Sequence, residues 1–248
     1  RSAAGQSGMR WFAHVVFRAI VLVLLAVFLS STSSSQTNFT FVNVLAQIGL
    51  GYPILSLLAG RSNRALLVIA VGILGAYWTA FAVYETPDSV RTDIADYIHE
   101  NRKPAYEAEW KSIERAGFAS HWNKHTNFAA AADRWFLNLF PRPETPWRGK
   151  RFWINDGGYQ TLNFVPSLAT MLFGLIAGQM LRKEIPWQWK VTRLLAWSAV
   201  CFIVAMAADT SLWPVRIEGW DWTICPAVKR IWTANWAVFS TRRCFMML

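Results

Sequence analysis

Charged residues are scarce in this chain of 248 residues: Asp, Glu, Lys and Arg make up 16% of it, whereas a soluble domain carries about 25%. Cysteine is scarce as well, and three widely spaced cysteines exclude a disulfide scaffold. Apolar residues make up 54% of the chain and the mean hydropathy is +0.22, which excludes a disordered polypeptide. The composition therefore indicates a folded and markedly apolar protein.

Long apolar runs are what the sequence has in place of charge. A helix needs about 20 apolar residues to cross the hydrocarbon core of a bilayer, and lipid requires every backbone polar group to be satisfied within the segment, which favours helices. Five stretches approach this length, namely 11–29, 39–59, 65–83, 162–181 and 191–208, and a sixth, 231–248, begins without finishing. We therefore expect an all-α polytopic membrane protein, with about six transmembrane helices in a single domain over residues 1–248.

The two ends of the chain need separate interpretation. The stretch 11–29 also resembles a secretion signal, because basic residues precede it and small polar residues follow it, but two more apolar runs come directly after. The membrane interpretation is therefore favoured. The last stretch carries Arg242 and Arg243 after about a dozen apolar residues, and the chain stops inside this run. We expect a fragment, incomplete at both ends and inactive by itself.

Basic residues concentrate on one side of the predicted helices. If the segments alternate in direction, the side of the N-terminus collects eleven basic residues and one acid, whereas the loops 84–160 and 209–230 each sum to zero. The positive-inside rule then predicts cytoplasmic short loops and an outer loop, 84–160, in the periplasm of a bacterial inner (plasma) membrane protein. The basic residues lie beside helix ends and form no patch, so nucleic acid is not an expected partner.

Polar side chains within the apolar stretches are candidates for a substrate path. Asn43 and Gln47 lie four residues apart, on one face of a helix, and should face other helices or a cavity. The alternative is that they make hydrogen bonds between helices. Asn163 lies at the start of the fourth stretch. Later in that stretch, the spacing of Gly174 and Gly178 predicts the close approach of another helix.

The outer loop 84–160 is long enough to have its own structure and function. Its pattern predicts helices over about 89–101, 106–116 and 128–140, the last capped by Asn127. In that last helix, four apolar residues are expected to share one face; they are Trp135, Phe136, Leu139 and Phe140.

Two histidines in the outer loop are candidate functional residues. His121 and His125 have the spacing of metal ligands on a helix, but no third Cys or His is near, so no metal is expected. Either histidine paired with Asp133 would suit proton transfer. The alternative is an ordered loop held together by Asp133, Arg134 and tryptophan packing.

Three stretches, taken in order along the chain, resemble one family of membrane enzymes. They are FVNVLAQIGLGY at 41–52, ADRWFL at 132–137, and GYQTLNFVPSLATMLFGLIAG at 158–178; VKRIWT at 228–233 is a fourth. Together they resemble heparan-α-glucosaminide N-acetyltransferase and its bacterial relatives. The resemblance covers nearly the whole chain.

The resemblance implies a multi-helix membrane acyltransferase that moves an acetyl group from cytosolic acetyl-CoA, as co-substrate, to an amino sugar. The family's active-site histidine lies upstream of this chain, so none of the histidines here takes its role, and Asp133 and Arg134 match as site-supporting residues. Asn43, Gln47 and Asn163 would line a polar path, and Asn127 and Arg134 would help the outer loop hold the acceptor.

Other interpretations remain open at this point. The protein could be a transporter or a non-catalytic envelope assembly component, or the outer loop could be a binding module on an inert anchor. The expected partners are the lipid bilayer and a sugar or glycan acceptor, and a homo-oligomer is left open.

Overall fold

The computed structural model describes residues 8–34, 36–142, 146–156 and 159–211, with side chains up to Ile203 in the last range. Its secondary structure is helical, which confirms the all-α prediction for the described residues. The longer helices are α1 (Gly8–Ser31), α2 (Val44–Leu58), α3 (Asn63–Val83), α7 (Phe164–Leu181) and α8 (Trp187–Ser211). Shorter elements lie between α3 and α7: α4 (Asp88–Asn101), α5 (Pro104–Ile113), the 3₁₀ turn η2 (Gly117–Trp122), α6 (Phe128–Leu137) and the 3₁₀ turn η3 (Thr161–Asn163).

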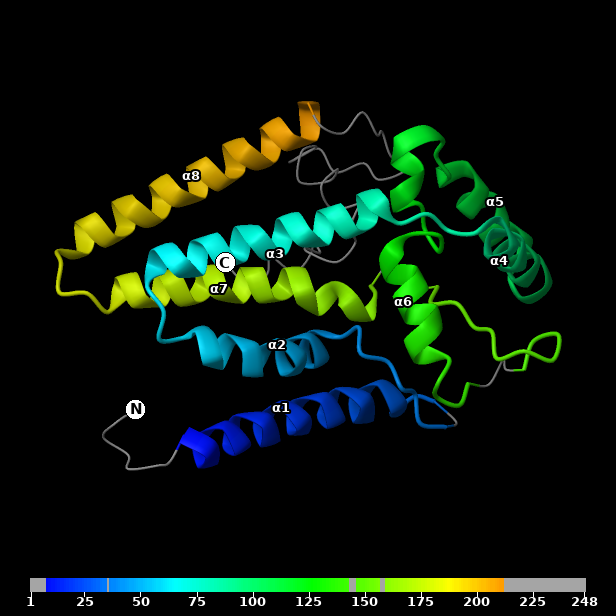
Figure 1. Ribbon diagram of the computed structural model, residues 1–248, viewed down its shortest axis with the longest axis horizontal. Coiled ribbons are helices and arrows are strands. Elements are labelled where there is room, and N and C mark those ends of the chain that lie inside the picture. The colour runs from blue at the N-terminus through cyan, green and yellow to red at the C-terminus, as the bar shows by residue number, and fades with distance from the viewer. Residues whose placement is uncertain (1–7, 35, 143–145, 157–158, 212–248) are drawn as a thin grey trace.

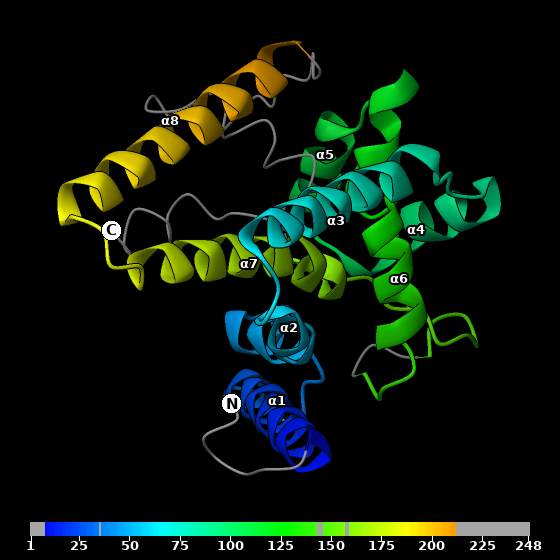
Figure 2. The same ribbon diagram turned by 60° about the vertical axis from the view of Figure 1, so that its left-hand side comes forward.

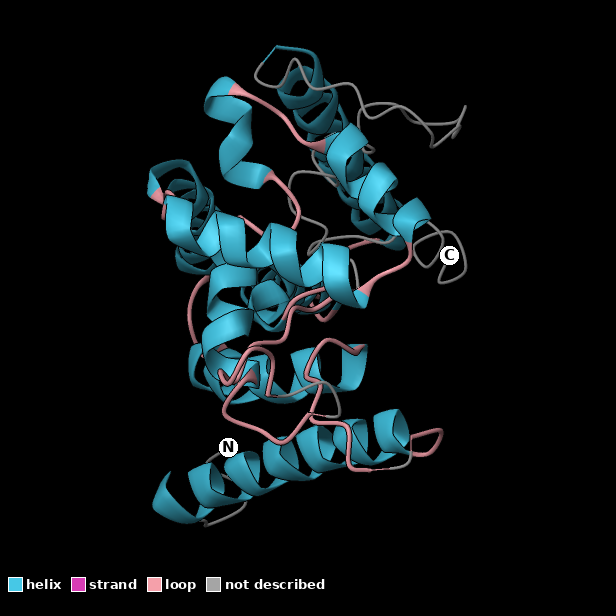
Figure 3. Ribbon diagram, turned by 90° about the vertical axis from the view of Figure 1, so that its right-hand side faces the viewer, coloured by secondary structure: helices cyan, strands magenta, loops and turns pink. Residues whose placement is uncertain are grey.

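The long helices form a row in the order α1, α2, α7, α3, as Figures 1 and 2 show. Leu66 and Ala70 of α3 and Leu172 of α7 are fully buried in the core between these two helices. The turns between α2 and α3 and between α7 and α8 lie at one end of the long helices (Figure 1). Helices α4, α5 and α6 lie at the opposite end of the long helices. The second group, with its connecting loops, is the outer layer; Figure 3 looks onto it.

Three helical segments in the described part of the chain are long and apolar enough to cross a membrane: Gly8–Ser31, Asn63–Val83 and Thr161–Leu181. They expose large apolar side chains, such as Phe28 at 65% and Val68 at 71%. Exposed apolar surface on this scale is costly in water and typical of a lipid-facing surface. These features fit a multi-pass membrane protein.

The prediction of six transmembrane helices is wrong for the part of the chain that the structure describes. The second predicted segment, 39–59, is shortened because Asn43 caps the helix, so that α2 has 15 residues and spans about 22 Å at helical rise. The fifth segment, 191–208, lies within α8, which is not one of the three long apolar helices and has Lys190 and Arg193 in its first two turns. The sixth, 231–248, lies outside the described residues.

Glycine permits a close approach between helices, but at positions other than those predicted. A Cβ atom added at Gly49 of α2 would lie 2.8 Å from Val23 Cγ2 and 3.0 Å from the Ala19 carbonyl oxygen of α1. At Gly174 and Gly178, an added Cβ would meet nothing within 4 Å among the described residues. Within the described part of the chain, the close approach of helices is thus found at Gly49, between α1 and α2, and not at the two predicted glycines.

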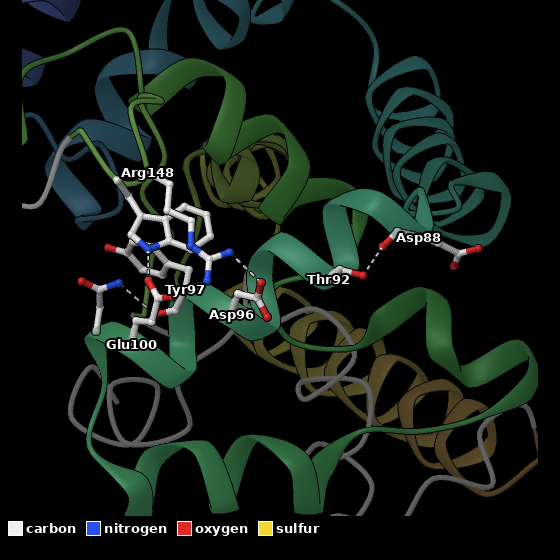
Figure 4. A network of polar contacts seen from close by, with 8 residues as sticks. Asp88, Thr92, Asp96, Tyr97, Glu100 and Arg148 are labelled. Carbon is white, nitrogen blue, oxygen red and sulfur yellow. Dashed lines mark hydrogen bonds and ion pairs between the residues drawn. The ribbon is translucent and has the colours of Figure 1, made fainter.

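The outer layer has its own core beside the long helices. Ile94, Tyr97 and Ile98 of α4 pack with Trp110 of α5 and with Trp147. On the exposed side of α4, the Arg148 guanidinium bridges Asp96, at 2.7 Å, and Glu100 (Figure 4). The predicted helices over 89–101, 106–116 and 128–140 are present as α4, α5 and α6, the last two ending earlier than expected.

Candidate functional site

Asp133 lies on α6 where the outer layer meets the long helices. Asn127 begins this helix by accepting a hydrogen bond from the Ala130 N–H at 2.9 Å, which confirms the predicted cap. The side chain of Asp133 is buried, with 2% of the residue exposed. Its Oδ1 accepts a hydrogen bond from the backbone N–H of Thr161 at 2.9 Å, and its Oδ2 accepts one from Asn155 Nδ2 at 3.0 Å.

Two buried hydroxyl groups accompany this carboxylate. The Tyr77 hydroxyl of α3 and the Thr161 hydroxyl of η3 have no hydrogen-bond partner among the described residues. Tyr77 belongs to the same buried cluster as Ala129, one turn before Asp133 on α6, and Leu162, next to Thr161, packs against this cluster. Buried hydroxyl groups normally find a partner. The Asp133 carboxylate lies close enough to the Tyr77 hydroxyl to interact with it electrostatically, and it accepts the backbone N–H of Thr161. We call Asp133, Tyr77 and Thr161 the junction cluster.

Burial governs the electrostatics of the junction. It raises the pKa of Asp133, and the hydrogen bonds from Asn155 and Thr161 oppose this shift. Burial also lowers the pKa of Arg134. The Arg134 guanidinium donates to the His125 carbonyl and so holds the loop before α6. A substrate contact by Arg134 stays a prediction. A carboxyl group with a raised pKa is better suited to exchange protons near neutral pH.

His121 is held in a defined orientation within η2. Its Nδ1 lies 2.7 Å from the Tyr84 carbonyl oxygen, so Nδ1 carries a proton and donates it. In the neutral ring, Nε2 therefore has the free lone pair, which is the form that a general base needs. The ring lies among aromatic side chains, 5.6 Å from Phe118 and 6.0 Å from Trp122 between centroids.

His125 lies in a different environment and is joined to a second carboxylate. Tyr106 donates its hydroxyl hydrogen to Asp156 at 3.3 Å, and the same hydroxyl lies 2.8 Å from His125 Nε2. Arg102 pairs with the other oxygen of Asp156 at 2.6 Å. Burial, together with nearby Lys124 and other cations, lowers the pKa of His125 to about 3, so the ring is neutral. This chain of contacts ties α5 to the loop before α6.

The structure does not join either histidine to Asp133 by a hydrogen bond: His121 binds Tyr84, and His125 binds Tyr106. It also places His121 and His125 in different local structures, the first in η2 and the second in a turn with φ of 71°. Among the described residues, no group of three or more His, Cys, Asp or Glu side chains is arranged to hold a metal ion. Catalytic roles for His121 and Asp133 stay predictions.

The amides predicted to line a polar path make packing contacts. Asn43 Nδ2 donates to Ser30 of α1 at 3.1 Å and to the Ala26 carbonyl at 3.0 Å. Gln47 accepts a hydrogen bond from the Ser167 hydroxyl of α7 at 2.7 Å. These contacts match the alternative of hydrogen bonding between helices.

Asn163 and Asn127 are likewise engaged within the protein. The buried Asn163 side chain pairs with the backbone of Gln160 once its amide is oriented to satisfy both groups. The side chain of Gln160 in turn donates to Asn127 at 3.3 Å, beside the cap of α6. Substrate contacts by these two residues stay predictions.

Comparison with protein-family models, with curated proteins and with solved structures finds no match for this chain.

Sequence reasoning missed the residues that surround Asp133 and His125. Tyr77, Asn155 and Thr161 surround the first, and Tyr106 and Asp156 surround the second. A signal was available for Tyr77, because a hydroxyl group within an apolar helix normally needs a partner. Asn155 and Thr161 gave no local signal, since each meets Asp133 only through folding.

Proposed function

We propose that this protein is a membrane acyltransferase that moves an acetyl or other acyl group from cytosolic acyl-CoA to an amino sugar or another cell-envelope glycan. One observation carries the proposal: the three described stretches of the family resemblance contact one another. Gln47 of the first binds Ser167 of the third, and Asp133 of the second binds the backbone of Thr161 in the third. The first pair is 120 residues apart in the sequence and the second pair is 28 residues apart, and both contacts lie at the outer end of the long helices.

The proposed reaction needs a base on the outer side of the membrane. The amine nitrogen of the acceptor attacks the thioester carbonyl carbon, the carbon–sulfur bond breaks, and coenzyme A leaves as the thiolate. The proton lost from the amine goes to a base. Within this chain, His121 is the candidate for such a base, in addition to the upstream histidine that the resemblance implies, because its contact with the Tyr84 carbonyl leaves Nε2 as the basic nitrogen. Phe118, 57% exposed, offers an apolar surface beside it.

The ends of the long helices that lie opposite the outer layer suit the binding of the acyl donor. Arg61 and Arg64 are exposed around the turn before α3, and Arg182 and Lys183 are exposed in the turn after α7. These cations would attract the phosphates of coenzyme A. Their position opposite the outer layer (Figure 1) also supports the proposed orientation in a bacterial inner membrane, with the basic turns cytoplasmic and 84–160 periplasmic.

The test uses the full-length protein in inverted inner-membrane vesicles, which expose the cytoplasmic face. Radiolabelled acetyl-CoA is added outside, and glucosamine is enclosed in the lumen. We expect labelled N-acetylglucosamine in the lumen, a loss of at least ten-fold, about 1.4 kcal/mol in the barrier, with His121→Gln, and full activity with the exposed control His99→Gln. Absence of transfer together with absence of acetyl-CoA binding would refute the proposal. In a parallel assay, radiolabelled glucosamine is added outside the vesicles, and its uptake into the lumen without acetylation would support the transporter alternative instead.

A further inference from the structure

The outward side of α6 exposes large apolar side chains. Trp135 is 73% exposed, and Leu139, four residues later in the turn that follows α6, is 58% exposed. The predicted single apolar face is therefore divided, because Phe136 and Phe140 turn inward. We call the surface formed by Trp135 and Leu139 the α6 apolar edge.

The position of α6 relates this edge to the membrane. Figures 1 and 2 both show α6 running across the direction of α3 and α7, at their outer ends. A helix at the level of the helix ends and transverse to them lies along the plane of the bilayer surface. This is the orientation of an amphipathic helix in the membrane interface.

The aromatic residues beside the α6 apolar edge pack on the connection that follows α1. Phe140 stacks on Phe39 with ring centroids 4.8 Å apart, and Phe136 contacts Phe41 at 5.4 Å. Both partners lie in the connection that follows α1. The outer end of α1 itself exposes Phe28 at 65%, and α1 is one of the helices long and apolar enough to cross a membrane.

We propose that the α6 apolar edge lies in the outer interfacial layer of the bilayer, with Trp135 and Leu139 at the boundary between lipid headgroups and acyl chains. Tryptophan is enriched at this depth, because its ring is apolar and its N–H can bind water or headgroups. The exposed Arg151, whose guanidinium lies 3.5 Å from the Leu139 carbonyl oxygen, is placed to meet a lipid phosphate. The membrane thus anchors the outer layer as well as the long helices, whatever reaction the protein performs.

The proposal is tested by spin-label accessibility in bilayers of phosphatidylethanolamine and phosphatidylglycerol. The full chain, with Cys201, Cys225 and Cys244 replaced by serine, receives a single nitroxide label in the variants Trp135→Cys and Leu139→Cys. We expect several-fold more collision with lipid-soluble oxygen, relative to water-soluble nickel chelate, than at a label on Ala108→Cys, on the exposed side of α5. Phe28→Cys on α1 supplies the lipid-facing reference.

Every outcome bears on the proposal. Because Trp135 and Leu139 are largely exposed, each variant should keep the melting temperature of its parent, and the two labels report independently. Preference for the nickel chelate at both positions, as at Ala108, would overturn the proposal. If a soluble glycan added to the vesicles, rather than lipid, shielded both labels from the nickel chelate, the proposal would also be overturned. The edge would then be assigned to sugar binding.

Discussion

The carboxylate of Asp133 accepts the backbone N–H of Thr161 at 2.9 Å, which joins α6 of the outer layer to the turn that begins α7. The contact lies where the protein changes from apolar helices to a polar outer layer. Because Asp133 is buried and its second oxygen is held by Asn155, both of the carboxylate's oxygens are used in fixing this junction.

Replacing Asp133 by asparagine should weaken the junction. The amide keeps one acceptor oxygen but places an NH₂ group against either the Thr161 N–H or the Asn155 amide donor, so one buried donor is left unsatisfied. We expect a loss of about 1–3 kcal/mol in the free energy of unfolding, measured by thermal unfolding in detergent. The exposed Asp88→Asn variant is the control and should stay close to the parent; an equal loss in both variants would contradict this role of Asp133.

The stability of the protein should depend on pH through His125. Its pKa is lowered to about 3 in the folded protein by burial, whereas the unfolded value is near 6.5. The unfolded state therefore binds more protons between these values, and the stabilising contribution present above about pH 6.5 is lost as the pH falls toward 3. The expected slope is up to about 1.4 kcal/mol per pH unit.

The effect of His125 is isolated by comparison with His125→Asn, because asparagine tolerates the positive φ of this position. The raised pKa values of Asp133 and Asp156 act in the opposite direction, since they favour the folded state as carboxylates are protonated. These contributions are common to both proteins. The difference between the two unfolding curves should therefore shrink on acidification below pH 6.5, and a constant difference would refute the assignment.

Local patterns predicted much of the fold because the determinants of each helix are close in sequence. Asn127 caps α6 through Ala130, three residues away, and the apolar runs of α1 and α3 are visible directly. The start of α2 was predicted too early because hydropathy alone extended the segment through Phe39, whereas the polar cap at Asn43 fixes it. At the start of α2, the preference of asparagine for the N-cap position outweighs the apolar character of the residues before it.

The candidate site could be predicted only in part. Asp133 and His121 are recognisable as chemistry-bearing residues, but the partners that define their roles lie far away in sequence. Asn155 is 22 residues from Asp133, and Tyr84 is 37 residues from His121. Periodicity reports which face of a helix is apolar and gives no information on which distant segment covers it.

Replacing Gly49 by alanine (Gly49→Ala) should disrupt the packing of α1 on α2. The added Cβ would lie 3.0 Å from the Ala19 carbonyl oxygen, a backbone atom that cannot move without shifting α1. We expect a loss of about 1–3 kcal/mol from overpacking, measured by thermal unfolding. Gly72→Ala in α3 is the matched control, because nothing lies within 4 Å of its added Cβ, and it should be neutral or slightly stabilising. Equal stability of the two variants would contradict the close approach at Gly49.

Replacing Arg142 by lysine (Arg142→Lys) should weaken the attachment of the outer layer to the connection between α1 and α2. The buried Arg142 guanidinium donates to Asn38 Oδ1 at 3.3 Å and to the Phe39 carbonyl, and it lies 4.3 Å from the centre of the Trp153 ring. A lysine ammonium cannot make the two forked contacts and the flat stacking together. We expect hydrogen exchange over residues 36–42 to accelerate by about ten-fold or more, equivalent to about 1.4 kcal/mol of lost local stability. Arg151→Lys, at an exposed arginine nearby, should leave exchange in this segment unchanged. Equal exchange in the two variants would mean that the phenylalanine stacking alone holds the outer layer to this connection, since Phe39 and Phe140 are present in both.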